Sequence, residues 1–440
     1  MPRNVWILSG IGLAVAVGFG VVAPVLPVFA ASFSVGEVAA AAVISAFALM
    51  RLVFAPAVGW LTDRWGHRAV LVAGVLIVAV SSLAVGFAQS YGQVVVLRGL
   101  GGVGSAMFSV ASMTILLGSV AADRRGRASA LYQGSFLVGA VAGPAIGGLF
   151  GAISLRAPFF FYSITLGAAA AVALRLEPIG PGPGTGPRRG AGPSGPGPGA
   201  AAEAGGGDVA APGEGDLAAS GEGGPAASWE GGLAASGENG GQVRPLRVVW
   251  RDRRYQAALL AALAQGWNTN GTRAALVPLF VAAFLAADDA QAALFAGIAM
   301  AVGALAQMAA VWPAGVVVDK LGRRGPMVVG ALVAAAALAA LPFSGSLATL
   351  AGLMAVYAVG AALIGTAPAA LVGDAAGPGG TRAIALYSMA GDAGSVVGPL
   401  AAGFLAAEFS YVTACAAGAA LLAASAAFSA VMRPPAGLGE

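Results

Sequence analysis

The stretch Gly59-Trp-Leu-Thr-Asp63-Arg-Trp-Gly66-His-Arg68 returns 256 positions later as Gly315-Val-Val-Val-Asp319-Lys-Leu-Gly322-Arg-Arg324. A second stretch, Arg127-Ala-Ser-Ala-Leu-Tyr132, returns as Arg382-Ala-Ile-Ala-Leu-Tyr387 at an offset of 255. That offset also carries Gly139, Gly143, Pro144 and Gly148 onto Gly394, Gly398, Pro399 and Gly403. Two motifs that recur at offsets within one residue of each other indicate that the chain consists of two related halves.

The composition predicts a lipid-embedded protein. Of 440 residues, 58% are hydrophobic and only 10% are charged, whereas soluble domains carry roughly 25% charged residues. One cysteine and one histidine exclude a disulfide framework and a Cys/His metal site. The charges lie mostly between apolar runs and form no patch of the kind that binds nucleic acid. We find no catalytic nucleophile with a nearby base and no phosphate-binding loop, so we expect neither an enzyme nor a cofactor.

Apolar runs of about 20 residues are long enough to cross a bilayer, and the sequence contains twelve of them. The prediction is an all-α integral membrane protein with twelve transmembrane helices in two pseudo-symmetric six-helix bundles. A cleavable signal peptide is the alternative for the first run, but Pro24 and Pro27 interrupt that run, and cleavage would leave an odd number of spans. The expected spans lie near 5–30, 37–60, 69–89, 93–117, 129–151, 158–175, 255–285, 291–314, 326–343, 347–371, 383–407 and 411–432.

Four segments are expected. Residues 1–177 and 247–433 form the two bundles, 178–246 form a Gly/Pro/Ala-rich disordered cytoplasmic linker, and 434–440 form a short cytoplasmic tail. We expect the protein to lie in the inner (cytoplasmic) cell membrane. Basic residues gather in alternate short loops, which predicts that those loops and both termini lie on the cytoplasmic side. The loops on that side carry Arg64, Arg68, Arg124, Arg125, Arg127, Lys320, Arg323, Arg324 and Arg382, against Arg156 alone on the other side.

In these motifs the sequence resembles the major facilitator superfamily, and the resemblance covers the chain outside the linker. Both copies of the loop after the second span of each half match its pattern G-x-x-x-D-R/K-x-G-R/K-R/K, except for His67 at one basic position. The run from Leu97 to Gly104 resembles the fourth-span motif, and the run from Gly139 to Gly148 resembles the fifth-span motif of exporters of the drug/proton antiporter branch. The resemblance implies two bundles around a central cavity that opens alternately to either side.

We call the two repeated loop sequences the loop motifs. Asp63 and Asp319 lie among basic residues where a helix ends, so each carboxylate can stabilise a neighbouring helix N-terminus or pair with a guanidinium group. The resemblance implies that they act as latches for the outward-facing state. The alternative is that the arginines merely follow the cytoplasmic bias of positive charge. The gating candidates are Gly59, Asp63, Arg64, Gly66, Arg68, Gly315, Asp319, Gly322 and Arg324.

The glycines of the fifth span repeat every four residues and predict close helix packing. Pro144 withholds a backbone donor and predicts a bend. A tight, bendable interface between the halves is the functional interpretation, and ordinary small-residue packing is the alternative. The set comprises Gly139, Gly143, Pro144, Gly147, Gly148, Gly398 and Pro399.

Charges inside spans are costly, at about 2.5–3.5 kcal/mol each, and therefore mark candidate sites. Four qualify: Arg51, Arg98, Arg273 and Asp392. Asp392 is the candidate proton carrier, with a structural ion pair or packing hydrogen bond as the alternative. Arg98 matches a fourth-span arginine that the resemblance links to proton transfer or solute coupling, but a structural residue near the outer interface is also possible.

Polar residues of the fifth, seventh and eleventh spans are the candidate solute contacts. Polar packing between helices is the competing interpretation. With Arg51, the set comprises Tyr132, Gln133, Gln265, Asn268, Asn270, Arg273, Tyr387 and Ser388.

The leading hypothesis is a monomeric transporter that exports small amphipathic compounds by proton antiport. Its partners are then a small-molecule solute, protons and membrane lipid, with no nucleic acid. The alternative is an importer or facilitator of a small polar or anionic metabolite, because three embedded arginines face one aspartate.

Overall fold

The computed structural model describes residues 1–120, 124–176, 249–250, 252–322, 324–376 and 381–431. The predicted linker (178–246) and tail (434–440) lie outside the described residues, as do Arg323 and the side chains of Asp319, Arg125 and Arg382.

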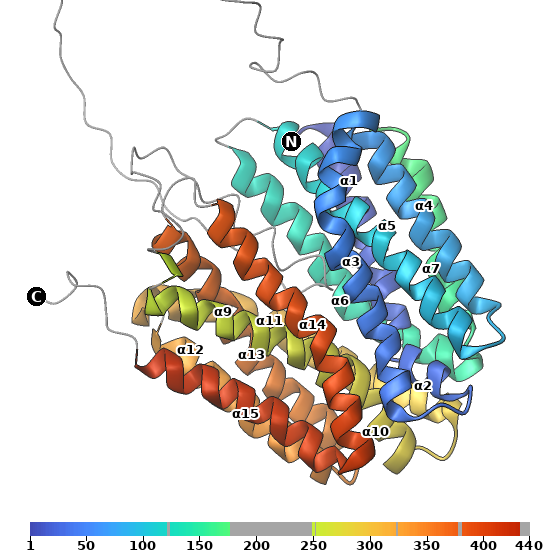
Figure 1. The fold of residues 1–440 in the computed structure, drawn as a ribbon, viewed down its shortest axis with the longest axis vertical. Coiled ribbons are helices and arrows are strands. Elements are labelled where there is room, and N and C mark those ends of the chain that lie inside the picture. The colour runs from blue at the N-terminus through green and yellow to red at the C-terminus, as the bar shows by residue number, and fades with distance from the viewer. Residues whose placement is uncertain (121–123, 177–248, 251, 323, 377–380, 432–440) are drawn as a thin grey trace, which may run out of the picture.

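The described chain is helical throughout, in two bundles that lie side by side (Figure 1). The first bundle consists of α1 (Arg3–Val22), α2 (Leu26–Ala31), α3 (Glu37–Trp65), α4 (His67–Gly86), α5 (Tyr91–Gly118), α6 (Arg125–Ile153) and α7 (Ala157–Ala173). The second consists of α9 (Arg253–Gly266), the π-helix η2 (Trp267–Leu276), α10 (Val277–Phe284), α11 (Asp289–Leu321), α12 (Arg324–Ala340), the short η3 (Leu341–Phe343), α13 (Leu347–Ala376), α14 (Thr381–Glu408) and α15 (Tyr411–Ala430).

These helices account for the twelve expected spans. Ten described helices are long and apolar enough to cross a membrane. The sixth span is the apolar α7 of 17 residues, and the seventh runs through α9, η2 and α10 without a loop between them. The first span bends at the turn between α1 and α2, where Pro24 and Pro27 lie.

Each bundle has its own apolar core. The larger cluster of buried side chains draws on residues 5–176 and adds only Leu279 and Ala293 from the second half. The second-largest cluster lies in the second half and adds only Val28 from the first. Many large apolar side chains on the outside, such as Ile164 and Val80, are exposed, as expected for a surface that faces lipid.

Short loops with side-chain caps set the helix starts. Ser90, Asp288 and Ser410 each accept a hydrogen bond from the backbone N–H three residues on, which satisfies one of the unpaired donors of the first turn. Gly66 and Gly322 join helices inside the two loop motifs with φ of +83° and +74°. Any other residue at these positions would have a strained backbone, which explains why both motifs have glycine there.

The fifth-span glycines pack mainly within a half, so the expected interface between the halves is wrong for most of them. A Cβ on Gly143 would lie 2.6 Å from the Cα of Gly20 in α1, and one on Gly147 would meet the backbone of Val21. Gly394 and Gly398 likewise pack on α9 and η2. Because the four-residue repeat puts glycines on one helix face, they share one partner, and that partner is the first helix of the same half.

Gly148 and Gly403 are the exceptions, since they do face the other half. A Cβ on Gly148 would lie 3.1 Å from the Cα of Gly297 in α11, and one on Gly403 would lie 3.0 Å from the Cβ of Ala41 in α3. These are the same contact made twice, because offsets of 255 and 256 relate its two sides. This interface lies at the ends of the helices opposite the loop motifs.

The two halves part toward the loop-motif end. In α3 every residue of 37–51 except Leu49 is buried or half-buried, whereas 53–65 is exposed on most sides, with Val58 and Thr62 as the buried exceptions. The repeat-related α11 follows the same course, from a mostly buried first half to a more exposed second half. In Figure 1, α2 and α10 lie together at one end of the bundles, and α1 and α9 diverge toward the other. The structure is therefore the state that is open at the loop-motif end.

Candidate functional site

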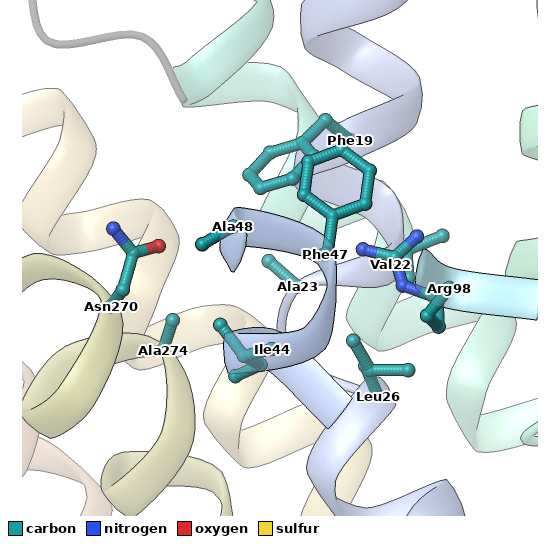
Figure 2. A pocket seen from close by; sticks show the side chains of 10 residues that line it. All are labelled: Phe19, Val22, Ala23, Leu26, Ile44, Phe47, Ala48, Arg98, Asn270 and Ala274. Carbon is teal, nitrogen blue, oxygen red and sulfur yellow. The ribbon is translucent and has the colours of Figure 1, made fainter. Parts of the chain in front are cut away.

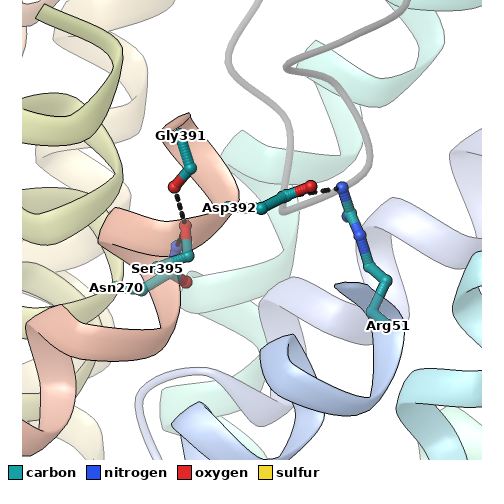
Figure 3. A network of polar contacts seen from close by, with 5 residues as sticks. All are labelled: Arg51, Asn270, Gly391, Asp392 and Ser395. Atoms are coloured by element: carbon teal, nitrogen blue, oxygen red, sulfur yellow. Dashed lines mark hydrogen bonds and ion pairs between the residues drawn. The ribbon is translucent and has the colours of Figure 1, made fainter. Parts of the chain in front are cut away.

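An ion pair joins the two halves near the middle of the bundle. Arg51 of α3 and Asp392 of α14 lie 3.3 Å apart, from Nη2 to Oδ1 (Figure 3). Their side chains are 4% and 16% exposed, so both are largely withdrawn from solvent. Both residues stand out in the sequence as charges inside spans, and the structure brings them together from opposite halves.

Polar contacts continue along α14 for one further turn. Ser395 accepts a hydrogen bond from the Asn270 amide at 3.0 Å and donates one to the carbonyl of Gly391 at 3.0 Å (Figure 3). Ser45 of α3 donates to the carbonyl of Val396 at 2.7 Å, which is a second bond between the halves. Sequence reasoning missed Ser45 and Ser395. Ser395 lies one turn from Asp392 in the sequence, which could have indicated it, but serines are common in membrane helices.

The polar seventh span forms a π-helix over Trp267–Leu276. π-Helices are rare in proteins, and those that occur are often found at functional sites. Its candidates separate in space. Asn268 is fully buried and donates to the carbonyls of Ala264 and Gly418, so it packs helices together. Arg273 donates to Gln307 at 3.3 Å within the same half.

Asn270 lies on a small cavity between the halves, which Figure 2 shows. The cavity volume is ≈ 20 Å³, which is room for about one water molecule and far below the ≈ 300–1,000 Å³ of sites for drug-sized ligands. In this state it holds no more than a small group. The lining residues are Phe19, Val22, Ala23, Leu26, Ile44, Phe47, Ala48, Arg98, Asn270 and Ala274.

Arg98 of α5 enters this cavity from the first half. Its side chain is 4% exposed, and its Cζ lies 4.6 Å from the centre of the Phe47 ring. Within the part of the chain that the structure describes, Arg98 makes no hydrogen bond or ion pair, and its buried Nε has no acceptor. It is thus separate from the Arg51–Asp392 pair.

The remaining solute candidates do not line this cavity. Tyr132 is buried and shares a hydrogen bond of 2.9 Å with Ser112 of α5 inside the first bundle. Gln133 and Ser388 are buried, and Gln265 and Tyr387 are half-buried. The structure brings together Arg51 with Asp392, and Arg98 with Asn270, but it does not gather the full predicted set.

The loop motifs have matching contacts in both halves. Arg68 donates to the carbonyl of Leu174 after α7, and Arg324 donates to the carbonyl of Ala430 at the end of α15. Each arginine thus caps the last helix of its own half, where the partial negative charge of a helix end favours a cation. Asp63 and Arg64 are exposed, and Asp63 makes no hydrogen bond or ion pair to any described residue.

At the opposite, closed end a hydrogen bond crosses between the halves. Tyr411, the first residue of α15, donates to the Glu37 carboxylate at 2.7 Å. Glu37 begins α3, and its second carboxylate oxygen is buried without a hydrogen-bond partner among the described residues. The sequence places both residues at outer span ends but gives no sign that they meet.

Comparison with known proteins supports the interpretation of the fold. The family model of the Major Facilitator Superfamily matches residues 8–285 and 258–439. Two solved structures share the fold: a bacterial homolog of the human lysosomal transporter Spinster in an inward-facing, occupied conformation (TM-score 0.68, 14% identity, 98% of this chain and 97% of that one), and a mutant form of the nucleoside transporter NupG (TM-score 0.69, 13% identity, 98% and 100%).

Curated relatives match over part of their length. The class B tetracycline resistance protein of Escherichia coli is 32% identical over 152 residues, which are 34% of this chain and 38% of that protein. The class G protein of Vibrio anguillarum is 36% identical over 162 residues (35% and 40%), and multidrug resistance protein 1 of Bacillus subtilis (strain 168) is 30% identical over 145 residues (33% and 37%). The matches thus span about two fifths of these relatives. With both halves matched by the family model, this multi-pass membrane protein belongs to the major facilitator superfamily of transporters and not to an enzyme family.

Proposed function

We propose that this secondary transporter is a proton-coupled exporter of small amphipathic compounds, located in the cell membrane with both termini in the cytoplasm. The partial relatives support this, since their names describe tetracycline and multidrug resistance. The loop motifs, with their basic residues, then lie on the cytoplasmic side. In that orientation the structure is open to the cytoplasm, as an exporter must be when it accepts its solute.

The observation that carries the proton coupling is the Arg51–Asp392 pair between the halves. An ionised Asp392 attracts Arg51 and holds α14 against α3. A proton on Asp392 removes the negative charge and weakens that attraction. Because the pair joins elements that belong to different bundles, the protonation state of one carboxylate biases how the bundles sit against each other. The role in proton transfer that the resemblance implies for Arg98 stays a prediction.

Substitution of Asp392 by asparagine tests this coupling. In proteoliposomes with an imposed pH gradient, Asp392→Asn should abolish uphill accumulation of a tetracycline probe while sparing downhill exchange, because the pathway stays and the titrating group is gone. Asp288→Asn is the matched control, since Asp288 only caps α11 at an outer loop and asparagine caps equally well. Uphill transport by Asp392→Asn at the rate of the unsubstituted protein would exclude Asp392 as the proton carrier.

An importer or facilitator of a small polar or anionic metabolite is the second candidate. Three arginines against one aspartate inside the spans support it. Uptake into inside-out vesicles that are acidic inside distinguishes the exporter from the importer or facilitator. An exporter fills such vesicles with solute at the expense of the gradient, whereas an importer or facilitator does not concentrate it there.

A further inference from the structure

The Arg98 guanidinium is a buried charge that the described part of the chain leaves without a counter-charge. Among the described side chains Asp392 is the one acidic group deep in the spans, and it already pairs with Arg51. The Arg98 side chain instead lies among Phe47, Val22 and Leu26 at the edge of the cavity (Figure 2). A charge buried without a partner is strongly unfavourable.

The Phe47 ring compensates only part of this cost. A cation over an aromatic ring gains about 0.5–2 kcal/mol, whereas the effective penalty for burying an unpaired ion is several kcal/mol. The missing stabilisation must therefore come from a species outside the described chain. Since guanidinium groups bind oxyanions and other anions through directed N–H donors, that species should be negative.

The cavity limits the size and the charge of such a species. Its volume of ≈ 20 Å³ suits a single ion or one end of a carboxylate. Its other walls are apolar except for Asn270, whose amide donates one hydrogen to Ser395 and carries a second. One guanidinium charge and one amide donor fit a monovalent anion better than a phosphate or sulfate.

We propose that this cavity binds a small monovalent anion on Arg98, either a free halide or the carboxylate group of the transported solute. The carboxylate case rests on the proposed transport function and names the solute class as amphipathic carboxylates. The halide case is independent of that function. Because Arg98 and Phe47 belong to the first half and Asn270 to the second, an anion held here touches both bundles.

Thermal unfolding of the full chain in nanodiscs tests the proposal without any gradient. Sodium chloride replaces sodium sulfate, whose divalent anion suits a single guanidinium poorly, at constant ionic strength. In a second series benzoate is compared with uncharged benzamide. We expect Tm to rise and saturate with chloride or with benzoate, but not with benzamide. Arg98→Gln should weaken the apparent affinity at least about tenfold, because a hydrogen-bonded charge is lost.

Arg156→Gln is the matched control. Arg156 also lies over a phenylalanine, 5.9 Å from the Phe29 ring, but its guanidinium donates to the carbonyls of Gly86 and Ala88, at and just after the end of α4. This variant should keep the anion response even if its Tm is lower. Saturation by chloride alone identifies a halide, and saturation by benzoate identifies the carboxylate.

An equal response in Arg98→Gln and the unsubstituted protein, or no response to either anion, overturns the proposal. If the unsubstituted protein shows the anion response but no proton-driven export, the proposed function is contradicted and the anion site is not.

Discussion

At the scale of single residues, the Glu37–Tyr411 hydrogen bond helps to hold the closed end together. A hydrogen bond to a charged group contributes about 1.5–3 kcal/mol, and roughly 1.4 kcal/mol is a factor of ten in a population. Tyr411→Phe should therefore shift the protein at least about tenfold away from this state, toward the one open at this end. Spin labels at Phe87→Cys and Phe343→Cys, two exposed positions related by the repeat at this end, should report longer distances.

Tyr91→Phe is the matched control for that measurement. Tyr91 donates to the Ala39 carbonyl at 2.8 Å, so it makes an equally short bond near the same end, but within one half. Its loss lowers the stability of the first bundle without favouring either state. Identical distance distributions in Tyr411→Phe and the unsubstituted protein would show that Glu37–Tyr411 does not hold this end closed.

It is easier to predict from the sequence which residues are important than to predict which residues contact each other. Asp392, Arg51 and Arg98 are evident as charges within apolar runs, because such charges are costly. Their pairing depends on how two bundles are placed against each other, and helical periodicity within one span carries no information about that. Arg51 and Asp392 are 341 residues apart.

At the scale of helices, close packing of α6 on α1 gives a prediction for stability. A Cβ at position 147 would meet the Val21 backbone far inside van der Waals contact, and backbone cannot move aside as a side chain can. Gly147→Ala should therefore separate α1 from α6 and lower Tm in detergent, at a cost of roughly 1–3 kcal/mol for overpacking.

The α1 glycine at position 10 supplies the comparison. Nothing lies within 4 Å of a Cβ there, and alanine favours a helix interior over glycine by about 0.5–1 kcal/mol. Gly10→Ala should thus raise Tm slightly. Equal melting temperatures for Gly147→Ala and Gly10→Ala would contradict the packing that the structure shows.

Helices were predictable where the physical signal lies along one span, and less so where it lies between spans. The apolar runs give all twelve crossings close to their observed limits, because bilayer thickness sets the length. The π-helix of the seventh span was not predicted, since its polar run Gln265 to Arg273 also fits an ordinary helix. The fifth-span glycines predict a closely packed neighbouring helix, but only the structure shows that this helix is α1 for Gly143 and α11 for Gly148.

For the whole molecule, the repeat predicts two like halves but not their relative position. A pseudo-symmetric chain can open at either end with nearly the same contacts, so the sequence is compatible with both states. The structure is open at the loop-motif end, and two features there are unused in this state: Asp63 is exposed, and nothing lies within 4 Å of a Cβ built on Gly59 or Gly315. These features are expected to matter when this end closes.

Asp63→Asn should therefore change the balance between states and leave the present state intact. A carboxylate at a helix N-terminus or beside an arginine contributes roughly 0.3–2 kcal/mol, so the state closed at this end should lose about 2- to 30-fold in population. The buried Cys415 is the only cysteine, so labels at Trp60→Cys and Trp312→Cys, both exposed on α3 and α11, can follow the distance across the open end. We expect the shorter-distance population to shrink in Asp63→Asn while the longer one keeps its position. Asp288→Asn, at the opposite end, should leave both populations unchanged. A distribution for Asp63→Asn that overlays the parent at every pH would show that Asp63 stabilises neither state, and the basic residues of the loop would then serve only to orient the chain in the membrane.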